Sequence, residues 1–236
     1  VFNNRQNTLE WLSAIYSSVP NTFINYHQEG PLSDDMAPHA EWTGWFAYDI
    51  VGKQMGNWNP SSEDNNDYWR VLPKKIRQAQ IFIQNVKPIE NQNLTVEEAE
   101  RMKLEARFLI AYYYALLVEF YGAVPFTAEP IDLDAPYDVL MMQQVPVHQV
   151  IDWIDNELLE VSKGLPASYT NPTLYGRATS LMCLAVRSRL LLLSASPLLN
   201  GNKDYMNHKN PNGEELFYSE YDVNRWQRAA NAAKEL

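Results

Sequence analysis

The chain has 236 residues, which is long enough to bury one sizeable hydrophobic core or two small ones. Its formal net charge of −10 argues against nucleic acid or an anionic membrane surface as a partner, because both require a basic patch. Lys74, Lys75 and Arg77 form only a short basic run, typical of a solvated helix face, and no apolar run is long enough to span a membrane.

The chain is expected to open with an amphipathic helix and a long irregular segment. Apolar residues recur at helical spacing over 7–19, so they would form one buried face. Between Pro20 and about Asn66 no helical period persists, and Gly, Pro, Asn and Asp recur among several tryptophans. We therefore predict an aromatic-rich loop region over 20–68, and unstructured connections of such length are often functional.

Two helices are predicted next. An apolar stripe at helical spacing runs from Trp69 to Val86, and Pro73 indicates that this helix either begins near that proline or is kinked there. Thr95 has Glu98 three residues later, which is the spacing of a capping box, so a second helix is expected to begin at Thr95. Apolar residues cover most of this helix's circumference, which predicts neighbours on several sides.

The second of these helices carries its own stop signal. Gly122 follows its last apolar turn and Pro125 comes soon after, a combination that ends helices. The following stretch, 127–144, has no helical period and is expected to be irregular. Pro146 suits the start of the next helix, which Gly164 would end.

The last part of the chain contains two more predicted helices. One covers 179–194 and is broken before Pro197, and the polar stretch 200–221 is expected to be an exposed loop. Asp222 or Asn224 would cap the final helix. The inner face of that helix is expected to hold Trp226, Ala229, Ala230 and Ala233.

Helices without recognisable strands predict an all-α fold of stacked antiparallel helix pairs, a tetratricopeptide-like array with long irregular loops. No repeat of fixed length is evident. We expect one domain over 1–236, with its helix-pair core at 69–195 and the start of a further pair at 222–236. Val1 is not an initiator methionine and the last helix runs into Leu236 without a cap, so we expect a piece of a longer protein.

Cysteine and histidine give no sign of a metal or cofactor site. Cys183 lies inside an apolar helical pattern with no evident basic neighbour, which predicts a buried structural thiol. The four histidines are scattered without metal-ligand spacing: His27, His39, His148 and His208.

Charged and aromatic residues inside the apolar helices are interpreted as parts of the scaffold. Arg107 should pair internally with Glu105, Glu119 or a backbone carbonyl. The same interpretation applies to Arg177, Arg187 and Arg189. The consecutive tyrosines 112–114 span their helix and are expected to serve packing rather than to form a binding cage.

Several short segments, taken together and in order, carry a family resemblance. They are Ser33-Asp34-Asp35, Trp69 with Ile76-Arg77-Gln78-Ala79, Glu105–Leu109 with Tyr121-Gly122 and Val124-Pro125, Val145-Pro146-Val147, Gly176–Thr179, Ser194–Leu198, and Trp226 with Ala229, Ala230 and Ala233. This order resembles the SusD/RagB family of cell-surface nutrient-binding lipoproteins, from Leu9 to the end of the chain.

The resemblance implies an all-helical, non-enzymatic protein that is lipid-anchored at the outer face of the outer membrane of Gram-negative bacteria. It implies delivery of glycans, or in some members peptides, into a SusC-like TonB-dependent transporter. The lipidated N-terminal cysteine and the large C-terminal part of family members are not in this sequence. Membrane attachment would therefore come only through an anchor that the chain lacks.

The predicted glycan site lies in the loop between Pro31 and Tyr68. Sugar binding needs flat aromatic faces together with carboxylates or amides that bond hydroxyl groups, and this loop has both. Trp58 is the first candidate for a stacking platform and Trp42 the second. The candidate hydroxyl partners are Asn57, Asn59 and Asp35.

Other interpretations of this loop stay open. Each tryptophan, Trp45 in particular, could instead pack the loop onto the helices. Asp34 and Asp35 could bind calcium, or one of them could cap a helix start. The acidic stretch 63–67 is either a solvated turn or a calcium loop.

Three other functions compete with glycan binding. The first is peptide binding by a member of the same family, and the second is a protein-only adaptor that uses the concave face of the helix pairs. The third is a polysaccharide hydrolase with a carboxylate pair, although no recognisable catalytic motif is present. That pair would come from Asp34, Asp35, Glu41 and Glu63.

Overall fold

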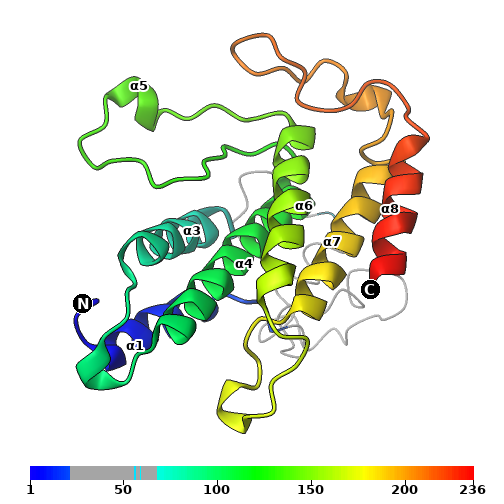
Figure 1. Ribbon diagram of the computed structural model, residues 1–236. Helices are drawn as coiled ribbons and strands as arrows, with labels where there is room; N and C mark the ends of the chain where they lie inside the picture. Colours follow the sequence, from blue (N-terminus) through cyan, green and yellow to red (C-terminus); the bar gives the residue numbers. More distant parts are fainter. Residues whose placement is uncertain (22–55, 57–58, 60–67) are drawn as a thin grey trace, which may run out of the picture.

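The computed structural model describes residues 1–21, 56, 59 and 68–236, so most of the predicted loop region lies outside the described residues. The described part contains seven α-helices, α1 (Arg5–Tyr16), α3 (Tyr68–Asn85), α4 (Val96–Tyr121), α5 (Tyr137–Leu140), α6 (Val147–Gly164), α7 (Ser180–Ala195) and α8 (Asn224–Glu235), shown in Figure 1. Short 3₁₀ turns occur at Glu90–Gln92, Pro172–Leu174 and Lys203–Tyr205. Extended pairing in this part is limited to isolated bridges, which confirms the all-α prediction.

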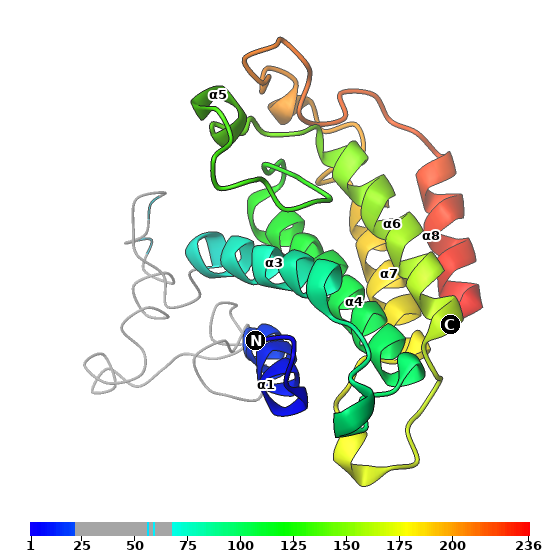
Figure 2. The ribbon, with the colours of Figure 1, turned by 60° about the vertical axis from the view of Figure 1, so that its left-hand side comes forward.

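The helices stack as antiparallel neighbours, as predicted. α3 packs on α4, α6 on α7, and α4 joins the two pairs by packing on α6. α8 adds to the array on α7, and Figure 2 shows α1 at the opposite edge, where it contacts α3 and α4. A long excursion between α4 and α6, with α5 near its tip, extends away from the array. In the part of the chain that the structure describes, no helix has the length and apolar character needed to cross a membrane.

The ends of α4 follow the signals in the sequence. The Thr95 hydroxyl accepts a hydrogen bond from the Glu98 backbone N–H at 3.1 Å. It thereby satisfies one of the N–H groups that have no partner within the first turn of the helix. The Glu98 carboxylate does not complete the reciprocal capping box. It binds the Arg5 guanidinium at 2.5 and 2.8 Å instead, so the cap of α4 also fastens α1. Gly122 ends α4 with φ +69°, a conformation that favours glycine.

Two helix boundaries differ from the expectation. α1 begins two residues earlier than predicted, because the Asn4 side chain accepts a hydrogen bond from the backbone N–H of Asn7 at 3.0 Å and caps the start of the helix. It ends at Tyr16, three residues before the predicted end. α3 begins at Tyr68, one residue before the predicted apolar stripe, so Pro73 lies inside the helix and only the alternative of a start near Pro73 was wrong. The α6 and α7 boundaries agree with the sequence signals to within one or two residues.

The core lies between α3, α4, α6 and α7. Its fully buried large side chains include Leu72, Phe82, Leu109, Tyr113, Ile151, Ile154, Leu158 and Leu191. Tyr113 and Tyr114 are buried, and the Tyr113 hydroxyl donates to the backbone oxygen of Ile15, so the predicted packing role of the tyrosines is correct. Cys183 is also fully buried, as predicted. Burial of these apolar side chains is the main force that holds the helices together.

The scaffold arginines form ion pairs within the chain, as predicted. The partners expected for Arg107, which were Glu105, Glu119 or a backbone carbonyl, were wrong. Arg107 binds Glu157 of α6 at 2.6 and 2.9 Å, because α6 packs across α4 at this level. Arg177 reaches the buried Glu105 at 3.1 Å. Burial raises the pKa of Glu105, while Arg177 and the hydroxyl of Tyr16 act in the opposite direction.

The inner face of α8 differs from the prediction. Its buried residues are Ala229 and Ala232, whereas Trp226, Ala230 and Ala233 are exposed. The physical reason is that α8 packs its small residues on α7 and also meets carboxylates of α6. The guanidinium of Arg228 lies 2.5 Å from both Asp152 and Asp155, and this pairing fixes the rotation of the helix.

Candidate functional site

Four of the five predicted site residues, Trp42, Trp58, Asn57 and Asp35, lie outside the described residues. The fifth, Asn59, is described and exposed. The prediction for this set therefore remains a prediction. The described chain resumes at Tyr68, the first residue of α3, so the surface around the start of α3 directly follows the predicted site in the chain.

Four aromatic side chains gather where α3 begins and α4 ends. We call Tyr68, Trp69, Phe120 and Tyr121 the aromatic platform. The ring centroids of Tyr68 and Phe120 are 4.9 Å apart and those of Trp69 and Tyr121 are 5.2 Å apart, both in edge-to-face geometry. The Tyr121 hydroxyl also accepts a hydrogen bond from the Trp69 backbone N–H at 3.2 Å. The antiparallel pairing of the two helices brings these residues together.

The aromatic platform faces solvent. Trp69 is 46% exposed, Phe120 is 52% exposed and Tyr121 is 40% exposed. Aromatic rings held edge-to-face by their neighbours are ordered before a ligand arrives, which lowers the entropic cost of binding. Such rings can stack on the apolar face of a sugar ring, and their polar tips can reach its hydroxyl groups.

A cavity of about 390 Å³ opens beside Trp69, between α3, α4 and the residues that follow α4. We call it the α3–α4 pocket. Its lining is mostly apolar, with Ile76, Leu117 and Pro125 among its walls and Arg77 and Gln80 as polar groups. Its volume lies within the usual range for small-ligand pockets.

Hydrogen bonds fix the polar side chains of this pocket. Arg77 donates to the Ile131 backbone oxygen at 2.5 Å, and Gln80 donates to the Thr127 backbone oxygen at 2.9 Å. The Tyr114 hydroxyl lies 3.1 Å from both the N–H and the oxygen of Thr127. Burial raises the pKa of Tyr114, so its hydroxyl stays protonated. The pocket wall is therefore a rigid surface and not a loose loop.

The segment after α7 was predicted as an exposed loop, and this expectation was wrong in part. The segment is irregular, but it folds back over the end of α4 and buries Asn210 and Leu216. It places the rings of Tyr205 and Phe217 4.6 Å apart. The Leu-Phe-Tyr run at 216–218 was the sequence signal that part of this otherwise polar stretch packs against the helices.

No described group of three or more His, Cys, Asp or Glu side chains is arranged to hold a metal ion. The Asp34-Asp35 and 63–67 calcium alternatives lie outside the described residues. The chemistry of the described surface is thus that of aromatic rings, amides and ion-paired charges. This chemistry suits binding of an uncharged, hydroxyl-rich or partly apolar ligand.

The chain was compared with protein families and solved structures. Residues 6–192 match the SusD-like family model described as "Starch-binding associating with outer membrane". The chain belongs to the SusD-like family. The predicted family resemblance is therefore confirmed, and no curated protein matches the chain.

Solved structures agree with this assignment. The structure of BT4246 is 28% identical with a TM-score of 0.83, and the match covers 98% of this chain and 39% of that one. A SusD-like carbohydrate-binding protein (BF0978) from Bacteroides fragilis is 20% identical with a TM-score of 0.62, and the match covers 82% and 38%. Surface glycan-binding protein A from Bacteroides uniformis is 19% identical with a TM-score of 0.63, and the match covers 98% and 45%.

The chain thus spans well under two thirds of each of these proteins. Its family is one of carbohydrate-binding proteins associated with the outer membrane and the cell surface. Members of this family are binding proteins and typically non-catalytic.

Proposed function

We propose that the protein binds glycans at the cell surface and delivers them to a SusC-like TonB-dependent transporter. The observation that carries this proposal is the match to the SusD-like family over residues 6–192. The exposed aromatic platform supports it, because aromatic faces with polar tips are the groups that sugar rings require. A lipid anchor would hold the protein at the outer membrane.

In this proposal the glycan site combines the predicted loop residues with the described surface. Trp58 and Trp42 stack on sugar rings. Their proposed polar partners for hydroxyl groups are Asn57, Asn59 and Asp35. Trp69 continues the stacking surface at the start of α3, where the chain leaves the loop region.

Affinity electrophoresis against a panel of polysaccharides tests the proposal. The wild type should be retarded by at least one glycan, and Trp58→Ala should lose most of this retardation. Trp42→Ala and Trp69→Ala should each weaken binding by about tenfold, the upper end expected for one aromatic contact. Trp45→Ala, whose expected role is packing, serves as the control. Wild-type protein that binds no glycan in a broad panel would contradict the proposal.

The hydrolase alternative is tested on the same samples. A binder leaves the polysaccharide intact, whereas a hydrolase releases new reducing ends. If new reducing ends appear with the wild type and are absent with Asp35→Asn, the protein is an enzyme. No such product is expected here, because the family is typically non-catalytic.

Peptide binding is the second candidate, and the apolar lining of the α3–α4 pocket favours it. Apolar walls around Ile76 and Leu117 suit an aliphatic side chain as well as the face of a sugar. Competition between a mixed peptide library and a bound glycan separates the two. If peptides displace the glycan from the wild type but not from Met142→Asn, whose partly buried side chain lines this pocket, the peptide ligand would be favoured.

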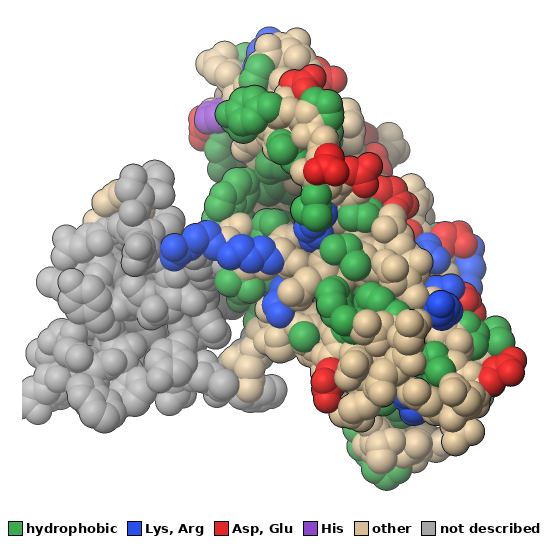
Figure 3. All heavy atoms as spheres, turned by 90° about the vertical axis from the view of Figure 1, so that its left-hand side faces the viewer, with side chains coloured by type: hydrophobic (Ala, Val, Ile, Leu, Met, Phe, Trp, Pro, Cys, Tyr) green, Lys and Arg blue, Asp and Glu red, His purple; other side chains and the backbone are tan. Residues whose placement is uncertain are grey.

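The transporter contact is assigned to the α5 loop, defined as residues 127–144. Leu133 is 85% exposed and Tyr137 is 75% exposed, and three further apolar side chains beside them are also exposed: Val139, Leu140 and Met141. Every charged residue of this loop is acidic: Glu129, Asp132, Asp134 and Asp138. Figure 3 shows hydrophobic and acidic side chains together on this side of the molecule. An apolar patch with an acidic edge fits a protein partner whose surface is apolar and edged by Lys or Arg.

A further inference from the structure

A second cavity, of about 420 Å³, lies between the end of α4, the end of α7 and the segment 198–217. We call it the α4–α7 pocket. It borders the aromatic platform through Phe120 and Tyr121, and the α3–α4 pocket borders the same platform through Trp69. Its described lining does not include Asn59, the one predicted ligand-binding residue that the structure describes.

One wall of the α4–α7 pocket is an irregular segment that two buried asparagines hold in place. The side chain of Asn210 accepts from the N–H groups of Asn212 and Glu214, at 3.1 and 3.0 Å. Asn200 exchanges two hydrogen bonds with the backbone of Asp222, at 2.9 and 3.0 Å. Buried side chains that satisfy backbone groups give an irregular segment a single conformation.

The same segment is fastened to itself, to the start of α6 and to the end of α4. The Leu216 N–H donates to the His208 oxygen at 2.9 Å, and the Leu216 oxygen accepts from the N–H of Val147 at the start of α6, also at 2.9 Å. Gly122 lies beneath the Phe217 ring so closely that a Cβ on it would be 2.8 Å from the ring carbons. The pocket wall is therefore ordered in the absence of a ligand.

The lining has the composition of a carbohydrate site. Tyr205, His208 and Phe217 form one aromatic cluster, with centroid separations from 4.6 to 6.1 Å, and Phe120 and Tyr121 face it from α4. Aromatic walls of this kind accept the C–H face of a pyranose ring. The hydroxyl groups of the ring then need hydrogen-bonding groups at the edge of the pocket.

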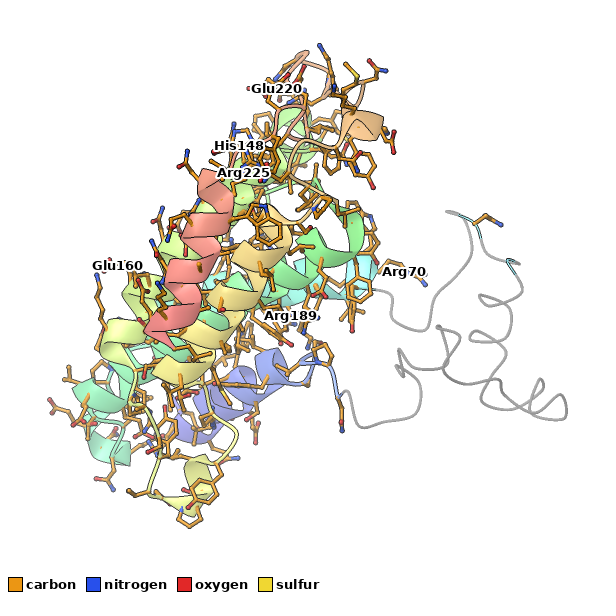
Figure 4. All side chains as sticks on the ribbon, turned by 90° about the vertical axis from the view of Figure 1, so that its right-hand side faces the viewer. Arg70, His148, Glu160, Arg189, Glu220 and Arg225 are labelled. Atoms are coloured by element: carbon orange, nitrogen blue, oxygen red, sulfur yellow. The ribbon has the colours of Figure 1, made fainter. Side chains whose placement is uncertain are left out.

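Glu119, Gln144 and His208 supply those groups. The carboxylate of Glu119 accepts from Arg189 of α7 at 2.5 Å, so its charge is compensated while it keeps lone pairs for a second donor. Figure 4 shows Arg189 on the side of α7 that faces α4. Gln144 donates through Nε2 to the Ala123 oxygen at 2.8 Å, which fixes its amide and leaves Oε1 available as an acceptor.

The charges around the pocket select for an uncharged ligand. Among the described residues that line it there is no Lys or Arg, and the described carboxylate, that of Glu119, is already paired with Arg189. No cation of the described lining is therefore placed to bind an acidic sugar. We propose that the α4–α7 pocket is a sugar subsite that takes a neutral pyranose ring, stacked on Tyr205 and Phe217 and bonded through its hydroxyls to Glu119, His208 and Gln144. This proposal rests on the proposed function and adds a second place of contact and a class of sugar to it.

Isothermal titration calorimetry with neutral oligosaccharides and with uronate oligosaccharides tests this proposal, using Glu119→Gln, His208→Ala and Tyr205→Ala. These three residues lie at or near the surface, so the variants should keep the urea midpoint of the wild type. Each should weaken binding of the neutral glycan by about five- to tenfold, as expected for the loss of one polar or aromatic contact. His148→Ala removes a histidine that contacts Tyr218 outside this pocket, and it should bind as the wild type does.

The outcomes are distinguishable. Wild-type affinity in all three pocket variants would overturn the subsite and leave the proposed function standing, provided that Trp58→Ala still weakens binding. Preference of the wild type for uronate chains would overturn the assignment to neutral sugars. Wild-type protein that binds neither class would overturn both the subsite and the proposed function. A variant with a lowered urea midpoint is replaced by Gln144→Ala, which should likewise weaken binding by about five- to tenfold.

Discussion

At the scale of single residues, Gly122 has two structural roles. Its φ of +69° allows α4 to end, and its missing side chain leaves room for the ring of Phe217. We expect Gly122→Ala to lose about 1 kcal/mol through backbone strain. A further 1–3 kcal/mol, roughly, should follow from the displacement of Phe217, as in other overpacked sites. Urea unfolding measures the total loss.

Gly176→Ala is the matched control for this prediction. Gly176 has φ +85°, and a Cβ built there meets nothing within 4 Å, so this variant carries only the backbone strain. The difference between the two variants is the contribution of the Phe217 contact. Equal losses of stability in both variants would show that Phe217 moves aside freely and that this pocket wall is not rigid.

The buried thiol of Cys183 gives a prediction about pH. Burial raises its pKa to about 12, from an ordinary value of 9.0. Between these two values the native state binds more protons than the unfolded state, so the free energy of unfolding falls as the pH rises through this interval. Cys183→Ala should lack this part of the decline, which urea titrations across the interval will show.

The same burial makes Cys183 unreactive. A disulfide reagent such as DTNB at about pH 8 should label the native protein far more slowly than the urea-unfolded protein, because the thiolate is the reacting species. Native protein that reacts as fast as unfolded protein would contradict the buried position. The burial of Cys183 could be predicted from the sequence alone, because the cysteine lies within an apolar helical pattern.

At the scale of elements, α8 is held by charge pairs as well as by the burial of Ala229 and Ala232. Asp155 of α6 accepts from Arg228 of α8 and from Arg187 of α7, and Arg187 also pairs with Glu235 at the end of α8. Asp155→Asn would leave two guanidinium groups without this counter-charge. We expect a loss of about 3 kcal/mol in the free energy of unfolding.

Glu160→Gln is the control on the same helix. Glu160 pairs with Lys163 on the surface of α6, where both side chains are about 60% exposed. Exposed pairs of this kind contribute little, so this variant should change the free energy of unfolding by less than about 0.5 kcal/mol. Equal effects of the two variants in urea unfolding would mean that α8 is held by its alanines alone.

Local sequence signals are sufficient to predict where a helix ends, but not how it is oriented or what it pairs with. The ends of α4 could be predicted because Thr95 and Gly122 act within one turn of the chain. The orientation of α8 could not, because it is decided by carboxylates about 70 residues earlier in the chain. The partner of Arg107 lies 50 residues away on another helix, which a helical pattern does not reveal.

At the scale of the whole molecule, the order of weak motifs predicted the family and the helix array correctly. The described part of the candidate surface was harder to predict, because its parts are distant in the sequence. Trp69 and Tyr121 are 52 residues apart and meet only because α3 and α4 are antiparallel. The segment 200–221 appeared to be a polar exposed loop because its buried asparagines, Asn200 and Asn210, resemble loop residues, although they order it. The predicted loop residues, from Asp35 to Asn59, stay predictions.

The exposed α5 loop gives a prediction for the assembled system. The triple variant Leu133→Ser, Tyr137→Ser and Met141→Ser removes much of its apolar surface. Because these side chains face solvent, the free energy of unfolding should stay within about 0.5 kcal/mol of the wild-type value. If this loop docks on the transporter, the loss of buried apolar anchors should weaken that complex by at least about tenfold, while glycan affinity is unchanged.

The control for this variant is the pair Tyr175→Ser and Leu181→Ser, which removes exposed apolar side chains just before α7 and at its start. Figure 1 shows the start of α7 at the end of the array away from α5. Co-purification of the protein with a SusC-like transporter measures the complex, and calorimetry with a bound glycan measures ligand affinity. Equal loss of the complex in both variants would indicate a nonspecific effect of apolar surface. Full retention of the complex by the triple variant would exclude the α5 loop as the contact, because an interface centred on Leu133 and Tyr137 cannot lose both anchors without weakening.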